Sequence, residues 1–215
     1  MKKTTLVVPA GSARVEAFIA EAKVSGRVSA TLGIVEPGLP KADADTDDPK
    51  AGTNCVPWNP LSFASARAAI LEAETMLGGR LDELLIVADP PPGATSLEQA
   101  TPRDIERSAL EWAAGYAELI REMAKRMIET GSGTIALVVV QADRGPLGSI
   151  AAGALAGLAE SLVCAGSVPV RYIGVNDESG QPDLLARHLV KTLDDTGRDT
   201  GKLQRFNGRG GLFGR

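Results

Sequence analysis

The segment from residue 101 to 175 decides the fold, with TPRD at 101–104, TIALVVV at 134–140 and VPVRYIGV at 168–175. Thr101 can cap a helix start, Pro102 suits the first helical position, and Asp104 places a carboxylate in the first turn. Apolar residues recur every three or four positions up to Gly131, which predicts one long amphipathic helix. TIALVVV shows no alternation, so we expect a strand buried on both faces of a parallel sheet.

A second helix, built almost entirely from small residues, is predicted between these two strands. It covers about 149–165, with its leucines on one stripe and alanine and glycine elsewhere. A membrane span is the competing interpretation, but Glu160 and the weak hydrophobicity of alanine and glycine argue against it. The segment 168–175 then predicts the next strand.

The rest of the chain predicts the same alternation of strands and helices. Strands are expected at 4–8, 27–35, 54–58 and 81–88, and helices at 13–23, 63–77 and from 181 to about 193. Residues 37–52 are acidic and proline-rich. Asp43, Asp45, Asp47 and Asp48 lie there, and we interpret them as part of a solvated loop rather than a metal site, because nothing fixes their geometry. Residues 200–215 form a tail rich in glycine and arginine.

Together these elements predict one α/β domain over 1–215, a Rossmann-like doubly wound parallel sheet with helices on both faces. The net charge of −4 argues against a nucleic-acid surface. Cys55 and Cys164 lie in apolar sequence without metal-ligand spacing, so we expect buried thiols, no metal and a cytoplasmic protein. The apolar run 6–9 is too short for a signal peptide.

Four segments in order resemble the short-chain dehydrogenase/reductase family, with a shortened N-terminal half. Residues 79–88 (GRLDELLIVA) resemble the family's G-x-L-D-x-L-V-N-N-A-G strand, and residues 127–136 (MIETGSGTIA) resemble the approach to its fifth strand. Residues 148–162 (GSIAAGALAGLAESL) are similar to Y-S-A-S-K-A-A-L-x-G-L-T-x-S-L. Residues 200–201 with 208–211 are similar to the closing T-G and G-G pairs.

The catalytic set that this resemblance implies is missing. Its tyrosine position holds Gly148, its lysine position Ala152, and its serine position Val139 or Val140; the asparagine falls near Trp112. Glycine, alanine and valine cannot transfer a proton, so we expect no intrinsic oxidoreductase activity.

Cofactor binding is not expected either. The first turn, VPAGSA at 8–13, holds a single glycine, and Pro9 removes an amide donor. The family's N-N-A-G segment is replaced by IVAD at 86–89. Asp89 thus puts a carboxylate at the glycine position, where it would repel a phosphate. Glu36 alone is a weak signal for a ribose-binding acid.

The parts that resemble the family most are its subunit contacts. We therefore expect a catalytically inactive subunit that assembles with an active family member in a hetero-oligomer such as a heterotetramer. In this respect the chain is similar to the inactive subunit of the benzylsuccinyl-pathway alcohol dehydrogenase of toluene degradation. The expected interface residues are Tyr116, Ile120, Met123, Met127, Ser149, Gly153, Ala156, Gly157, Phe206 and Phe213.

Three alternatives remain open at this point. The helices are ordinary ones in a homo-oligomer without an active partner. The chain is an enzyme with other chemistry around His188, Asp89, Asp143 and Arg144, although His188 fits a packing histidine better. Or it is a module for a small ligand or acyl-CoA that uses the 90–93 loop and the space at Trp112, Gly148 and Ala152.

Overall fold

The structure is a computed structural model that describes residues 2–35, 54–90, 96–141, 145–166, 169–196 and 201–208. Its strands are β1 (Thr4–Val8), β2 (Val28–Ile34), β3 (Cys55–Trp58), β4 (Glu83–Ala88), β5 (Gly133–Val140), β6 (Val170–Asp177) and β7 (Gln204–Phe206). Its α-helices are α1 (Ala13–Val24), α2 (Phe63–Leu77), α3 (Pro102–Ser108), α4 (Gly115–Thr130), α5 (Gly145–Ala165) and α6 (Pro182–Asp194). Two short helical segments are η1 (Leu97–Gln99) and η2 (Ala109–Ala114).

The strands form one sheet in the order β3-β2-β1-β4-β5-β6-β7, and every neighbouring pair is parallel. The order reverses between β1 and β4, which is where ligands gather in open α/β sheets. The predicted Rossmann-like parallel sheet is confirmed. β5 is buried over Ile135–Val140 and pairs with β4 and β6 on its two sides, as its unbroken apolar run predicts.

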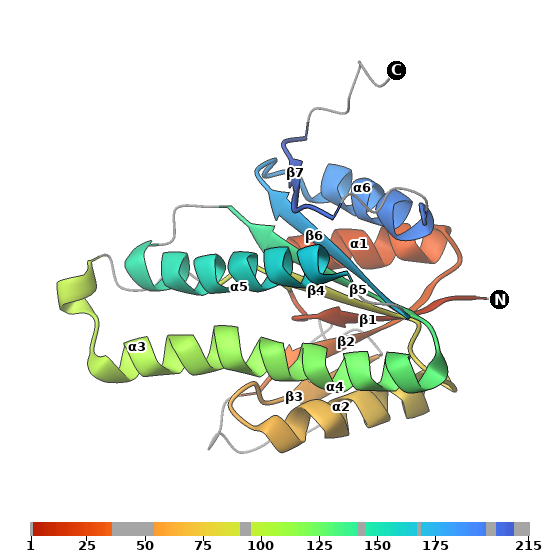
Figure 1. Cartoon of the computed structure of the whole chain (residues 1–215), viewed down its shortest axis with the longest axis horizontal. Helices are drawn as coiled ribbons and strands as arrows, with labels where there is room; N and C mark the ends of the chain where they lie inside the picture. The colour runs from red at the N-terminus through yellow and green to blue at the C-terminus, as the bar shows by residue number, and fades with distance from the viewer. Residues whose placement is uncertain are drawn as a thin grey trace, which may run out of the picture.

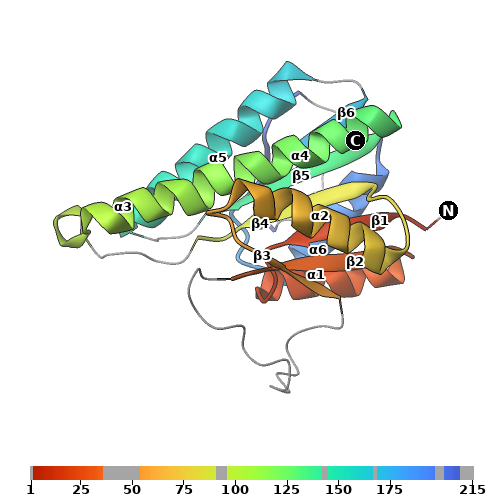
Figure 2. The same ribbon diagram turned by 90° about the horizontal axis from the view of Figure 1, so that it is seen from below.

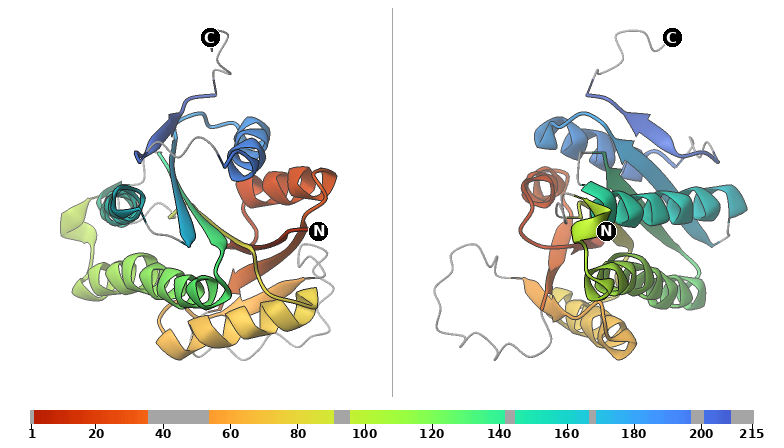
Figure 3. Two further views of the ribbon diagram at one scale, coloured as in Figure 1. Left: turned by 45° about the vertical axis from the view of Figure 1, so that its right-hand side comes forward. Right: turned by 90° about the vertical axis from the view of Figure 1, so that its left-hand side faces the viewer.

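Helices cover both faces of the sheet (Figure 1 and Figure 3). α2, α4 and α5 pack on one face, over a core that contains Leu84, Ile86 and Leu137. α1 and α6 pack on the other, over Val7, Leu85 and Val138, and are in broad contact with each other. α3 reaches beyond the sheet alongside α5 (Figure 2). The carboxyl ends of the strands therefore meet at one edge, between two helical layers.

The long helix predicted from Thr101 begins as expected. The Thr101 hydroxyl accepts a hydrogen bond from the Asp104 amide at 3.2 Å, and the Asp104 carboxylate accepts one from the Thr101 amide at 3.0 Å. The helix ends at Gly131 with φ +78°. In its middle, η2 widens into a π-helix, which the sequence pattern does not predict. The expected loop 37–52 and half of the tail lie outside the described residues.

Candidate functional site

The turn between β1 and α1 is the first part of the carboxyl edge. Val8–Pro9 is a cis peptide bond and Gly11 has φ +87°. The Ala10 amide donates to the carbonyl of Leu32 at 2.7 Å. Ser12 caps α1, because its hydroxyl accepts a hydrogen bond from the Val15 amide at 3.2 Å. Two of the backbone amides around this turn, those of Ala10 and Val15, are therefore already used in hydrogen bonds within the protein.

A bridge of three charged side chains lies next to this turn. Arg14, at the second position of α1, donates from Nη1 to Oδ2 of Asp89 at 2.9 Å and from Nε to Oδ2 of Asp177 at 2.9 Å. Asp89 follows β4 and Asp177 ends β6, so the guanidinium joins the ends of two strands that β5 separates. The roles of Arg14 and Asp177 could not be predicted from the sequence, because no local pattern links residues 163 positions apart.

The residues at this edge do not fit a dinucleotide. Its pyrophosphate needs a glycine-rich turn whose free amides approach from a helix start. Here Pro9 offers no amide donor, Ser12 already accepts from one of the helix-start amides, and Asp89 adds a carboxylate beside α1. At the end of β3, the Trp58 side chain is 1% exposed and belongs to the core. Glu36 lies outside the described residues.

The positions that the sequence resemblance assigns to the catalytic residues carry no proton-transfer group. Val139 and Val140 end β5 and are fully buried. Gly148 is buried in the first turns of α5, and Ala152 is half-buried against the core. Trp112 lies in η2 and stacks on Tyr116, with ring centroids 5.3 Å apart. These side chains pack, but none of them can act as an acid or a base.

Three aromatic rings form a cluster between the end of β3 and η2. Tyr116 meets Trp58 edge to face at 5.1 Å and Trp112 face to face. The Tyr116 hydroxyl and the Trp58 indole nitrogen are buried and have no hydrogen-bond partner within the described part of the chain. Burial raises the pKa of Tyr116 far above its ordinary value, so the hydroxyl stays protonated.

The predicted interface residues fall into two groups. Tyr116, Ile120, Met123 and Met127 are at most 4% exposed and belong to the chain's own core. Their apolar stripe packs against the sheet, so the prediction that these side chains meet a partner is corrected.

The α5 residues of the prediction lie on the outside. Ser149, Gly153 and Gly157 are exposed and Ala156 is half-buried. A Cβ added at Gly153 or Gly157 would meet no atom within 4 Å. We call Ser149, Gly153 and Gly157 the α5 stripe. Phe206 is half-buried against α6, and Phe213 lies outside the described residues.

α5 is unusually apolar for a helix with so much free surface. Within the described residues it is the one helix long and apolar enough to cross a membrane, a test that buried core helices also pass. Its most apolar window has a mean hydropathy of 1.6, yet only 28% of that window is buried within the chain. Its other face packs on the sheet through Leu155 and Ala159. One face of α5 therefore lacks a covering element among the described residues.

Of the four residues of the alternative enzyme hypothesis, the structure describes His188 and Asp89. His188 lies on α6 and stacks on Phe206 at 4.6 Å. Its Nε2 is buried without a hydrogen-bond partner in the described chain. Asp89 is held by Arg14. Asp143 and Arg144 lie outside the described residues, as does most of the 90–93 loop proposed for an acyl-CoA module.

Neither cysteine is fully buried. Cys55 is half-buried, whereas Cys164 is exposed on the last turn of α5, which corrects the prediction of two buried thiols. No group of three or more metal-ligating side chains occurs among the described residues.

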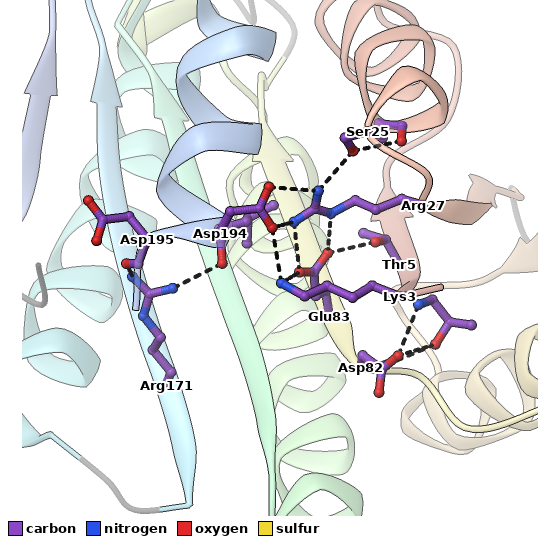
Figure 4. A network of polar contacts seen from close by, with 12 residues as sticks. Lys3, Thr5, Ser25, Arg27, Asp82, Glu83, Arg171, Asp194 and Asp195 are labelled. Atoms are coloured by element: carbon purple, nitrogen blue, oxygen red, sulfur yellow. Dashed lines mark hydrogen bonds and ion pairs between the residues drawn. The ribbon is translucent and has the colours of Figure 1, made fainter. Parts of the chain in front are cut away.

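A second charged network lies at the opposite, amino-terminal edge of the sheet (Figure 4). Arg27 donates from Nε and Nη2 to the two carboxylate oxygens of Glu83 at 2.8 and 3.1 Å, and from Nη2 to Asp194 at 2.7 Å. Thr5 donates to Glu83 at 2.8 Å, and Lys3 lies 3.2 Å from the Glu83 carboxylate.

Two hollows of about 600 and 510 Å³ adjoin this network. The buried charged side chains there, Arg27 and Glu83, already pair with each other. The network also ties α6 to β1 and β4. We interpret it as structural.

Comparison with known proteins supports the fold alone. No family model matches the chain, and no curated protein matches it in sequence. A short chain dehydrogenase from Mycobacterium smegmatis is 18% identical with a TM-score of 0.76, over 95% of this chain and 91% of that one.

Two further structures are similar over nearly their whole length. An oxidoreductase of the short chain dehydrogenase/reductase family from Brucella ovis, in complex with partially ordered NAD, is 14% identical (TM-score 0.75, 96% and 100% covered). A gluconate 5-dehydrogenase from Burkholderia cenocepacia, in complex with NADP and tartrate, is 16% identical (TM-score 0.69, 97% and 95% covered). The chain thus has the Rossmann-like fold of short-chain dehydrogenases.

Proposed function

We propose that this protein is a non-catalytic subunit with the short-chain dehydrogenase fold, which assembles with an active homologue and supports its structure or its site. α5 carries the proposal. By the resemblance, this helix holds Gly148 and Ala152 where the family's chemistry needs a tyrosine and a lysine. It also presents a small, apolar face that no other described part of the chain covers. The unequal pair of the toluene-degradation alcohol dehydrogenase is a precedent for such an arrangement.

The α5 stripe supports helix packing at short range. Side chains at Gly153 and Gly157 would meet open space among the residues that the structure describes, so a helix of the partner can approach the backbone closely. Ile150 beside the stripe is 51% exposed, and Ile105 and Leu110 of the neighbouring helical arm are 40% and 45% exposed. Burying such apolar side chains in a contact stabilises it by about 1.5–3 kcal/mol for each full burial.

The partner that we propose is an intact homologue with the Y-x-x-x-K pair, and the assembly is cytoplasmic. The exposed free thiol of Cys164 suits a reducing compartment. A second copy of this chain is the alternative occupant of the same face.

The test is co-expression with an intact homologue, followed by size-exclusion chromatography with light scattering and an assay of the homologue's NAD(P)H turnover. Gly153→Leu places a branched side chain on the stripe and should abolish co-elution without unfolding the chain. Gly79→Leu is the matched control, because a Cβ added at Gly79 would also meet no atom within 4 Å, while Gly79 follows α2 and lies far from α5 in the sequence. The control should pair normally.

Two results would contradict the proposal. One is a homologue that is fully active and never co-elutes with this chain. The other is a Gly153→Leu variant that pairs as well as the unmodified protein. A homo-oligomer that Gly153→Leu disrupts, without pairing to any homologue, would favour the second copy instead.

A further inference from the structure

The bridge of Asp89, Arg14 and Asp177 has a consequence for ligand binding at the carboxyl edge. Asp177 is fully buried, and one of its oxygens also accepts hydrogen bonds from the amide and hydroxyl of Ser179 at 3.0 and 2.6 Å. A buried carboxylate is tolerated only when it is paired and hydrogen-bonded. Arg14 is therefore needed where it is, as the cation that pairs with Asp177.

Arg14 is the second residue of α1. The amino end of a helix favours negative charge, so an anion bound there would also meet the Arg14 guanidinium. Its Nη1 binds Asp89, whose carboxylate is 24% exposed. The protein thus supplies its own anion beside α1. A phosphate arriving at this place would have to compete with Asp89 for Arg14 and would be repelled by the remaining negative charge, since the bridge joins two carboxylates to one guanidinium.

We propose that the Asp89–Arg14–Asp177 bridge takes the place of an anionic cofactor at the carboxyl edge, so that the chain folds without a dinucleotide and has no site for one. This inference deepens the proposed function, since it gives the physical reason for a subunit without a cofactor. It concerns the isolated chain, whereas the proposed function concerns assembly, so the two can fail separately.

The first measurement is nucleotide binding by the isolated full chain. NAD⁺, NADH, NADP⁺ and NADPH are titrated by calorimetry, and the thermal unfolding midpoint is recorded with each. A ligand present at about a hundredfold excess over its Kd would raise the folding equilibrium constant about a hundredfold. We expect no heat of binding. We also expect no rise in the unfolding midpoint when each nucleotide is present at about a hundred times a micromolar Kd. A rise with any of the four overturns the inference.

The second measurement tests the bridge by a double-mutant cycle of Arg14→Met and Asp177→Asn. Arg14→Met leaves Asp177 buried without its cation, and we expect the unfolding equilibrium constant to rise about tenfold or more. The double variant should be less destabilised than the product of the two single effects, because the charges are removed together. Arg121→Met is the control, since Arg121 pairs with Glu118 and Glu122 on the exposed side of α4.

An effect of Arg14→Met as small as that of Arg121→Met, or strictly multiplicative effects in the cycle, would overturn the role of the bridge. If Arg14→Met does not fold, Asp89→Asn replaces it, because Asp89 is partly exposed and its loss leaves the Arg14–Asp177 pair intact. Asp89→Asn should weaken folding less than Asp177→Asn. A larger loss with Asp89→Asn would contradict the assignment of Asp177 as the buried anchor.

Discussion

At the scale of single residues, His188 gives a pH dependence that the structure explains. Burial lowers the pKa of His188, and the nearby charge of Lys191 lowers it further. In the unfolded chain, histidine titrates near pH 6.5. As the pH falls through that value, the unfolded state takes up a proton before the folded state does, so the free energy of unfolding decreases.

The expected result is a loss of stability between about pH 7 and pH 5 that the variant His188→Phe does not share. Phenylalanine keeps a ring opposite Phe206 but cannot be protonated. Urea unfolding at several pH values measures the difference between the two proteins. Curves that stay parallel over this range would show that His188 is equally solvated in both states.

The sequence predicted which residues are apolar, but not what they pack against. The α4 stripe with Ile120, Met123 and Met127 was correctly identified, yet it covers the sheet rather than a partner. A stripe of this kind has the same spacing in both situations. The ion bridge of Arg14 was not predictable at all, because its partners Asp89 and Asp177 are brought to it by the topology of the sheet.

At the scale of elements, the strands and helices expected from periodicity are present with shifts of a few residues at their ends. β4 begins at Glu83 rather than at residue 81, and α5 begins at Gly145 rather than at 149. The π-helix of η2 escaped prediction, since widening a helix depends on tertiary contacts rather than on local spacing. The contact that lies next to it is the close approach of Gly115 to Pro60.

Gly115 is therefore expected to be intolerant of substitution. A Cβ there would lie 2.4 Å from the carbonyl oxygen and 2.7 Å from the Cβ of Pro60. Gly115→Ala should destabilise the chain by about 1–3 kcal/mol, because the backbone or the proline must move. Urea unfolding measures the loss.

The control for this prediction is Gly153→Ala, on the open face of α5. Alanine is favoured over glycine in a helix by about 0.5–1 kcal/mol, so this variant should be slightly more stable than the unmodified chain. Equal effects of the two substitutions would mean that Gly115 does not approach Pro60 closely.

At the scale of the whole molecule, the alternation of strands and helices was enough to predict a parallel sheet covered on both faces. Right-handed crossovers leave few ways to arrange such a chain. The assembly could not be settled in the same way, because the amount of free surface on α5 depends on how the helix sits on the sheet. The sequence indicated small residues there, and the structure adds that only 28% of the helix's most apolar window is buried among the described residues.

Hydrogen exchange of the whole chain tests the sheet and the proposed assembly together. In the isolated protein, β1, β4 and β5 should exchange slowest, because they are interior strands with buried side chains. The edge strands β3 and β7 should exchange faster. When an intact homologue is added, the largest slowing should fall in α5 and in the adjoining α3 and η2, where apolar side chains are exposed. Slowing confined to α6 and β7 would place the contact on the other face of the sheet and contradict the assignment of α5.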